Sequence, residues 1–272
     1  MFGVDAWRAA HVAQERAGIS IRTLDDPNQQ GIAVRIFDQV WPLGSGGTNV
    51  TSNLLRALLH SGGYASAAFD DRDGAPIGAA LAVVGRHRSP EDSSDPWHTH
   101  LHSHMAAVVE EHRDRSIGTA IKLHQRAWAL SQGIDTIVWS FDPLVRRNAW
   151  LNLHKLGTEV RGYEANFYGD MDDAINAGDP SDRVFAWWLL TSDRAVQAAA
   201  QPLPAVRVAD LCDVRIIDTP EDIVAVRRQS PTDAVSWRMS VRQQFLDAFE
   251  AGYRVIGLDT DGSYVLTGEK ER

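Results

Sequence analysis

Blocks of hydrophobic and polar positions divide the chain, and the sharpest change of pattern lies within residues 101–130. This stretch begins with mostly apolar or small residues and reaches charge at Glu110, as expected of a strand inside a sheet. From Ile117 the apolar residues recur at helical spacing, and Gly133 stands where a left-handed cap would end a helix. The pattern therefore predicts a strand, a charged turn and a helix in direct succession.

Such a turn has a chemical consequence. The first N–H groups of a helix have no partner within the helix, and with the positive end of the helix dipole they form a site for phosphate. An ordinary connection between a strand and a helix shows the same pattern, so the turn alone leaves both interpretations open.

Strands and helices alternate on both sides of this turn. Before it, the pattern predicts a helix at 5–17, a strand at 19–24, a helix from Pro27, a second helix around 52–61, and a hairpin of strands 64–69 and 77–84. After it, we expect a strand at 135–141, a helix at 146–156, and strands at 164–168 and 184–190. This alternation predicts an α+β protein with a mixed central sheet flanked by helices.

Residues 197–206 read as a linker to a C-terminal extension. The extension contains a predicted helix at 220–228 and a hairpin around residues 259–262. Between them an apolar stripe recurs every fourth residue at Trp237, Val241, Phe245 and Phe249. A stripe of this length needs a partner surface, which we expect either on the preceding domain or on a second subunit in a homodimer.

The turn carries a recognisable motif. Arg113-x-x-Ser116-x-Gly118 resembles the Arg/Gln-x-x-Gly-x-Gly/Ala signature of the GNAT superfamily of acyl-CoA-dependent N-acyltransferases, and Arg115-x-x-Gly118-x-Ala120 is a second frame. The resemblance implies that amides of the turn hold the pyrophosphate of coenzyme A and amides of the strand hold its pantetheine arm. The cofactor-binding residues implied are Ala106, Ala107, Val108, Arg113, Asp114, Arg115, Ser116, Ile117, Gly118, Thr119 and Asn148. Ser116 departs from the motif, which has a glycine at this position. A left-handed backbone conformation costs a serine more free energy than it costs a glycine.

The order of the elements also matches the family. From this match we expect a GNAT domain at residues 1–192 and the extension at residues 193–272. Segments such as LHSHM and FDPLVRRNAWLN resemble a bacterial branch of the superfamily, some members of which are linked to N-acylation of amino acids, including succinylation. The resemblance therefore implies an N-acyltransferase that uses acetyl-CoA or another acyl-CoA and acts on a small amine or amino acid.

Four histidines alternate on the strand before the turn: His98, His100, His102 and His104. On a continuous strand they face one way, which leaves three interpretations: a metal site, a structural cluster and a catalytic base. GNAT enzymes carry a base on this strand, and the equivalent position is His102, with His104 as the substitute if the register differs.

The family's usual general acid, a tyrosine, is replaced here by Leu153. Tyr163 and Tyr168 are alternative proton donors, and the thiolate could also leave unprotonated. A catalytically silent fold that binds acyl-CoA as a sensor or scaffold is the rival interpretation. Two arginine pairs, Arg86 with Arg88 and Arg146 with Arg147, are candidates for binding a carboxylate on the acceptor or on the acyl group.

Composition narrows the classes further. The net charge is −9 and the sequence has no Lys/Arg-rich run, which argues against a nucleic-acid partner. The single cysteine, Cys212, excludes an internal disulfide framework and suits a cytoplasmic protein. No apolar run approaches the roughly 20 residues that a membrane-spanning helix needs.

Overall fold

The computed structural model describes residues 2–44, 46–88, 97–169 and 179–268. The chain forms two compact units, one of residues 1–139 with 189–192 and the other of residues 140–188 with 193–272. The C-terminal extension therefore shares a unit with residues 140–188. The compact units do divide between 192 and 193, but residues 140–188 belong with the extension, so a single domain of residues 1–192 stays a prediction.

The first unit alternates between helices and strands in the predicted order. Its elements are α1 (Phe2–Ala17), β1 (Ile19–Thr23), α2 (Pro27–Val40), α3 (Ser52–His60), β2 (Tyr64–Asp70), β3 (Pro76–Arg88), β4 (Trp97–Val108), a short 3-10 turn (Glu110–His112), α4 (Ile117–Ser131) and β5 (Thr136–Phe141). Asp26 and Thr51 cap α2 and α3 through their side chains, and Gly133 has the left-handed φ of 74° that the pattern predicts after α4.

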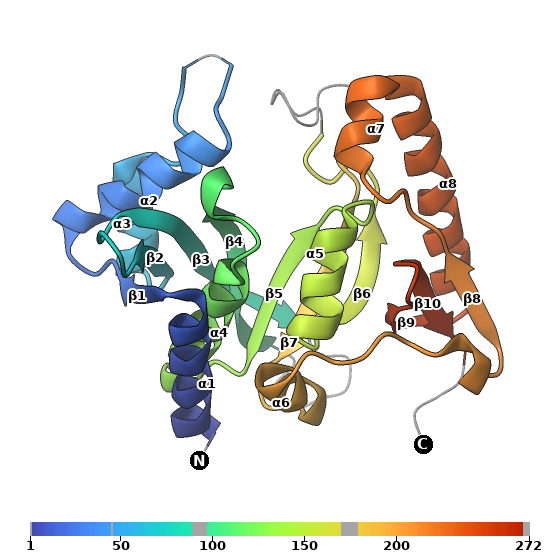
Figure 1. Ribbon diagram of the computed structural model, residues 1–272, viewed down its shortest axis with the longest axis horizontal. Coiled ribbons are helices and arrows are strands. Elements are labelled where there is room, and N and C mark those ends of the chain that lie inside the picture. Colours follow the sequence, from blue (N-terminus) through green and yellow to red (C-terminus); the bar gives the residue numbers. More distant parts are fainter. Residues whose placement is uncertain (1, 45, 89–96, 170–178, 269–272) are drawn as a thin grey trace. The chain divides into compact units, whose positions relative to one another are not determined.

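The larger sheet follows the strand order β1-β2-β3-β4-β5-β7-β6. Strands β1 to β4 are antiparallel neighbours, whereas β4 and β5 run parallel, so the sheet is mixed as predicted. Leu81 and Met105 face a core formed with α2 and α3, which also contains Phe37 and Leu55. Ser103 points to the other face, where it contacts Lys122 of α4. Helices thus cover both faces of the sheet in this unit (Figure 1).

The second unit holds the other half of the elements. They are α5 (Arg146–Trp150), a π-helical turn (Leu151–Lys155), β6 (Glu159–Glu164), β7 (Arg183–Leu189), α6 (Asp193–Ala200), a 3-10 turn (Val208–Asp210), β8 (Val214–Ile217), α7 (Ile223–Gln229), α8 (Pro231–Glu250), β9 (Arg254–Leu258) and β10 (Tyr264–Thr267). The last three strands form a separate antiparallel sheet in the order β8-β10-β9.

Two predictions in this half were wrong, and two features were not predicted. Strand β6 ends at Glu164, where we expected it to begin, because Asn166 turns left-handed with φ 49° and its N–H donates to Asp182. The expected linker begins inside α6, whose short amphipathic pattern escaped notice. The helix expected at 146–156 changes to a π-helical turn after Trp150, and β8 was not expected.

The apolar stripe of α8 packs inside its own unit. Val241 and Phe245 are fully buried, and the ring of Phe245 lies 5.4 Å from that of Tyr163 on β6 and 5.0 Å from that of Tyr264 on β10. Phe245 is therefore covered by β6 and β10 and Val241 is buried, whereas Trp237 and Phe249 are half-buried.

Across the described part of the chain, no helix combines the length and the apolar character that crossing a bilayer requires.

Candidate functional site

The turn between β4 and α4 has unusual backbone geometry. Asp114 and Ser116 both adopt left-handed conformations, with φ of 66° and 59°, which cost a residue with a side chain more than they cost glycine. Ser116 is the N-cap of α4, and its hydroxyl makes no capping hydrogen bond. The N–H groups of Ile117, Gly118 and Thr119 therefore begin the helix without a partner inside it.

Gly118 leaves space above this helix start. A Cβ built on Gly118 would meet no atom within 4 Å, and its backbone is ordinary helix. Neither packing nor conformation within the chain requires glycine here. A glycine that the fold does not need fits a position that a ligand approaches closely.

The two arginines of the turn have different surroundings. Arg115 donates to the Asp70 carboxylate at 2.7 Å and to the Ala17 carbonyl at 3.0 Å, so its guanidinium ties the turn to β2 and to the end of α1. Arg113 lies 3.6 Å from Glu110, which is exposed, and this pair is weak. Arg113 is thus the arginine that can turn to a ligand, which favours the frame beginning at Arg113.

Strand β4 is interrupted at His104. Ser103 pairs with Ala82 and Met105 pairs with Leu81, so His104 lies in a bulge outside the register. Only the register with β3 shifts there, and the rings of His102 and His104 remain 6.2 Å apart. The register with β5 ends at His102 opposite Val138, two residues before His104. From Ser103 onward, the β5 side of β4 has no paired strand within the described residues.

The residues expected to hold the pantetheine arm lie on this unpaired stretch. Ala107 is buried and belongs to the core cluster, Val108 is half-buried and Ala106 is exposed. What this segment offers a ligand is therefore backbone N–H and C=O groups rather than functional side chains.

The histidines divide into two groups. His98 and His100 lie on β4 itself, where the sequence had suggested a loop for His98, and both rings are near His87 of β3. The Nδ1 atoms of His87 and His100 are 3.1 Å apart, so one of the two must be protonated and the other not. Within the described residues, no three His, Cys, Asp or Glu side chains are grouped as metal ligands would be.

His102 is half-buried and stays neutral over a wide range. Burial first, and then the charges of His104, His100 and Lys122, lower the pKa of His102 to about 4. Its imidazole is therefore uncharged at neutral pH, with one ring nitrogen able to accept a proton, but it is also a weaker base than an ordinary histidine. His104, which would be the base if the register differed, is exposed. Glu110 and Glu111, the next carboxylates along the chain that could act as a base, are exposed as well.

The candidate proton donors lie in the second unit. Leu153 is fully buried in the π-helical turn and has no proton to give. The Tyr163 hydroxyl donates to Asp182 at 2.5 Å, and burial together with this carboxylate raises the pKa of Tyr163. Tyr168 is exposed, and its hydroxyl lies 3.1 Å from Ser140 Oγ.

Asn148 lies in the first turn of α5, in the second unit. The N-cap of this helix is Val145, and no side chain makes a capping hydrogen bond there. Arg146 is occupied, because it donates to Thr219 Oγ1 and to the Asp261 carbonyl. Arg86 and Arg88 are part of β3, and their guanidinium carbons lie 5.2 Å and 5.0 Å from the centre of the Trp97 ring.

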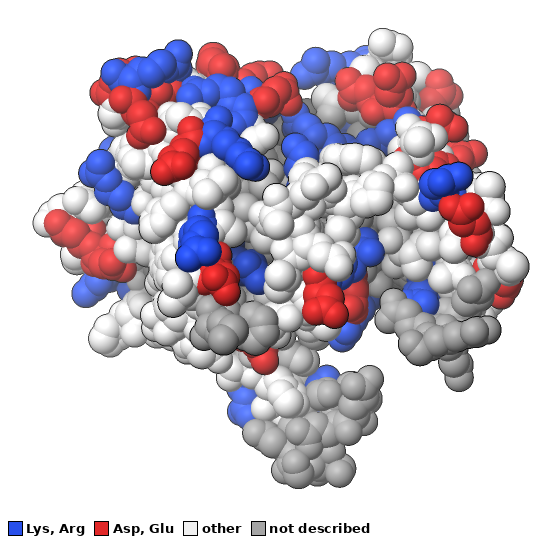
Figure 2. Space-filling view, turned by 60° about the horizontal axis from the view of Figure 1, so that its bottom comes forward, with Lys and Arg blue, Asp and Glu red and all other residues white. Residues whose placement is uncertain are grey.

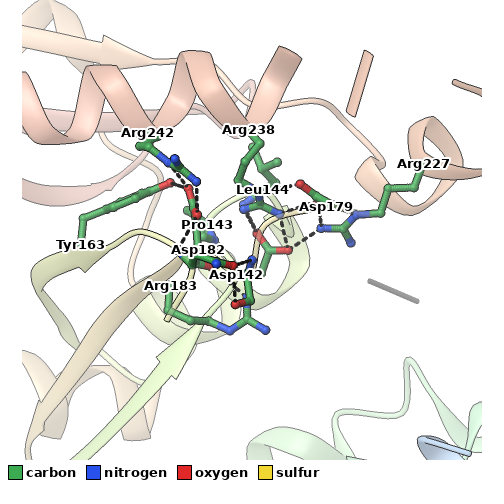
Figure 3. A network of polar contacts seen from close by, with 12 residues as sticks. Asp142, Pro143, Leu144, Tyr163, Asp179, Asp182, Arg183, Arg227, Arg238 and Arg242 are labelled. Carbon is green, nitrogen blue, oxygen red and sulfur yellow. Dashed lines mark hydrogen bonds and ion pairs between the residues drawn. The ribbon is translucent and has the colours of Figure 1, made fainter. Parts of the chain in front are cut away.

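The second unit is held by a charged network (Figure 3). Arg238 of α8, 1 % exposed, donates to Asp142 at 2.7 Å and to Asp179 at 2.8 Å, and Arg227 of α7 contacts the same two carboxylates. Burial by itself would raise the pKa of Asp142, but Arg238 and Arg227 outweigh it and hold that pKa at about 2. The extension is thereby fixed to the segment that follows β5.

Sequence reasoning missed Lys122. Its side chain is 5 % exposed, and its Nζ lies 2.7 Å from Ser103 Oγ, 3.1 Å from Gln125 Oε1 and 3.6 Å from the centre of the Trp139 ring. Burial lowers the pKa of Lys122 well below its ordinary value. A signal was present, because α4 carries apolar residues on every side and a lysine within it has to be buried.

Charge on the surface is mixed. On the face shown in Figure 2, Lys and Arg side chains stand beside Asp and Glu, and no large field of one sign is visible on that face.

No protein-family model matches the sequence, and no curated protein matches it. Several solved structures are similar. Arabidopsis thaliana NAA60 with acetyl-CoA is 15 % identical with a TM-score of 0.49, and the match covers 64 % of this chain and 99 % of that one. The ribosomal-protein-S18-alanine N-acetyltransferase of Escherichia coli is 12 % identical with a TM-score of 0.46, and the match covers 64 % of this chain and 95 % of that one. A GNAT family acetyltransferase of Elizabethkingia anophelis with acetyl-CoA bound is 15 % identical with a TM-score of 0.42, and the match covers 63 % of this chain and 98 % of that one.

The larger sheet of the described chain is mixed and has seven strands. Its strand order, with β4 parallel to β5 and antiparallel to β3, is the mixed sheet that the motif implied. With identities of 12 to 15 % and TM-scores below 0.5, these similarities do not establish an activity, which has to be argued from the site itself.

Proposed function

We propose that this protein is an acyl-CoA-dependent N-acyltransferase that acts on a small amine or amino acid. The observation that carries the proposal is the left-handed turn at Asp114 and Ser116, which opens α4 with unpartnered N–H groups beneath the empty space at Gly118. This arrangement suits a pyrophosphate. The acyl group that we propose is acetyl, with succinyl as the alternative.

The unpaired part of β4 supports the same placement of the cofactor. A pantetheine arm carries amide groups, and the edge of β4 beyond His102 offers backbone donors and acceptors to such groups. An arm that starts from pyrophosphate at the turn and runs back along Val108 and Ala106 brings the thioester toward His104, Ser103 and His102.

The chemistry then needs a base. An alkyl ammonium has a pKa near about 10 and no lone pair, so the acceptor has to lose a proton before it attacks the thioester carbonyl. We assign this role to His102, directly or through water. Its low pKa keeps it unprotonated and ready, at the expense of basic strength. An N–H group of β4 would stabilise the oxyanion.

The alternative is an acyl-CoA-binding protein without catalysis. The buried Leu153 at the position of the usual acid and the engagement of Tyr163 with Asp182 favour it. The two functions share the cofactor site and differ in turnover.

Binding and turnover measured on the same protein test the proposal. We expect calorimetry to detect binding of acetyl-CoA, and we expect thiol release from acetyl-CoA or succinyl-CoA to require an amine from a panel of amino acids and small alkylamines. Binding without thiol release for any acceptor would support the silent protein instead. Absence of binding to any acyl-CoA would contradict both.

A further inference from the structure

Lys122 is a buried cation whose polar contacts within the described residues include no carboxylate. Its Nζ contacts a hydroxyl, a side-chain amide oxygen and an aromatic face, all in the first unit. Its neighbour on α4, Arg126, is also buried but donates twice to the Leu190 carbonyl, as a structural arginine does. Burying an ammonium without a counter-ion is costly, and a group held this way readily gives up its proton.

The partner of Lys122 stands at a particular place in the sheet. Ser103 is the first residue of β4 beyond the register with β5 and lies directly before the bulge at His104. It is 6 % exposed, and its Oγ accepts from Lys122 Nζ at 2.7 Å. A hydroxyl can accept one hydrogen bond while donating another, so Ser103 can pass a proton between Lys122 and a group at the free edge of β4.

We propose that Lys122, acting through the Ser103 hydroxyl, supplies the proton that the departing coenzyme A thiolate takes up. The inference rests on the proposed function. It fills the role that Leu153 leaves empty and that Tyr163, bonded to Asp182, is poorly placed to fill.

The step balances without a further reactant. The acceptor ammonium loses two protons in all. His102 takes the first before the attack and releases it to solvent, and it takes the second from the nitrogen as the C–N bond forms and the C–S bond breaks. The thiolate takes the Ser103 proton, and Lys122 ammonium restores it. Exchange with solvent then returns the proton from His102 and recharges Lys122. A donor works best when its pKa lies near the working pH, and burial moves the pKa of Lys122 in that direction.

The surroundings of Lys122 determine how its titration is read. His102 on β4 is the titratable neighbour that interacts with its charge, while Ser103, Gln125 and Trp139 are neutral. The sequence has lysine at residues 122, 155 and 270. Labelling with lysine enriched in 13C at the ε position therefore gives three resonances, and the Lys122→Met variant assigns one of them.

The test compares Lys122→Met, Ser103→Ala and His102→Ala with the wild type in CoA affinity, in kcat as a function of pH, and in the NMR titration of the CoA complex. We expect kcat of the wild type to fall on the alkaline side with the same pKa that Lys122 shows by NMR. Lys122→Met should lower kcat by about 10²-fold or more, remove this alkaline limb and leave the Kd for CoA within about twofold. His102→Ala should keep the limb.

Ser103→Ala separates proton transfer from packing, because it removes only one oxygen atom. It should lower kcat to a similar extent while Lys122 still titrates. The proposal is overturned if Lys122→Met keeps the alkaline limb, or if Ser103→Ala has normal kcat in a protein that binds CoA. If Lys122→Met does not fold, Ser103→Ala decides alone. A wild type that binds acetyl-CoA and acylates no amine would overturn the proposed function, and the role of Lys122 with it.

Discussion

The Arg115 guanidinium joins the carboxylate of Asp70, 2.7 Å away on β2, to the carbonyl of Ala17 at the end of α1. The turn that we assign to pyrophosphate is therefore held by a contact that lies outside the turn's own backbone. Asp70 is 1 % exposed and binds Arg72 as well, which is exposed and does not belong to the turn.

Loosening this clamp should weaken cofactor binding without touching the cofactor. We expect Arg115→Ala to raise the Kd for CoA by about tenfold, because Asp114 and Ser116 would no longer be held in their left-handed conformations. Arg72→Ala is the matched control, since it removes the other arginine that contacts Asp70, and calorimetry should show nearly normal affinity. Equal losses in the two variants would show that the charge of Asp70, not the turn, is responsible.

Gly118 offers a test in which stability and binding should move apart. Gly118→Val places methyl groups in the open space and should weaken CoA binding at least tenfold, about 1.4 kcal/mol. Ser116→Gly should instead stabilise the free protein by about 0.5–1 kcal/mol, because glycine adopts the left-handed conformation more easily. Urea unfolding and calorimetry measure both quantities. A folded Gly118→Val protein with unchanged affinity would remove the turn from the cofactor site.

His102→Ala should lower kcat by roughly 10²–10⁴-fold and leave CoA affinity intact. Only neutral imidazole accepts a proton, and the pKa of His102 is about 4. The part of the rate that depends on His102 should therefore increase as the pH is raised to about 5 and stay constant at higher pH. The sequence alone would have put this rise near about pH 6.5. If His104→Ala shows the loss and His102→Ala does not, the base lies in the bulge.

Arg238 should be the most sensitive position of the charged network. Arg238→Met leaves Asp142 and Asp179 buried with only Arg227 between them, and we expect a loss of about 3–5 kcal/mol in the free energy of unfolding at pH 7. Arg161→Met is the control, because its ion pair with Glu159 is exposed, and it should cost less than about 1 kcal/mol. A cost for Arg238→Met as small as that of the control would show that the network does not hold the extension.

Lys122 should make the folded protein more stable as pH rises. Its pKa is lowered by burial, so between that folded pKa and about 10.5 the unfolded chain binds one more proton than the folded one. The free energy of unfolding should therefore gain about 1.4 kcal/mol per pH unit from this group, up to the unfolded pKa. The difference between wild type and Lys122→Met, followed by urea unfolding at several pH values, isolates the term. A difference that does not change with pH would mean that Lys122 is charged in the folded protein.

The sequence by itself determined the local order of the chain. Hydrophobic periodicity predicted the elements of the first unit, and Gly133 predicted the end of α4, because these features depend on neighbours within a few residues. The motif at Arg113, Ser116 and Gly118 directed attention to the turn, and Ser116 proved to adopt the left-handed conformation that the motif's glycine would favour.

Tertiary structure decided what no local pattern contains. The bulge at His104 and the end of the register at His102 depend on how β3 and β5 pair with β4. The sequence does not distinguish Arg115 from Arg113 as the arginine of the motif. The structure does, because Arg115 donates to Asp70, a residue far away in the sequence. The low pKa of Lys122 arises from burial against Ser103 and Trp139, since the cost of burying charge depends on what surrounds it in space and not on its neighbours along the chain.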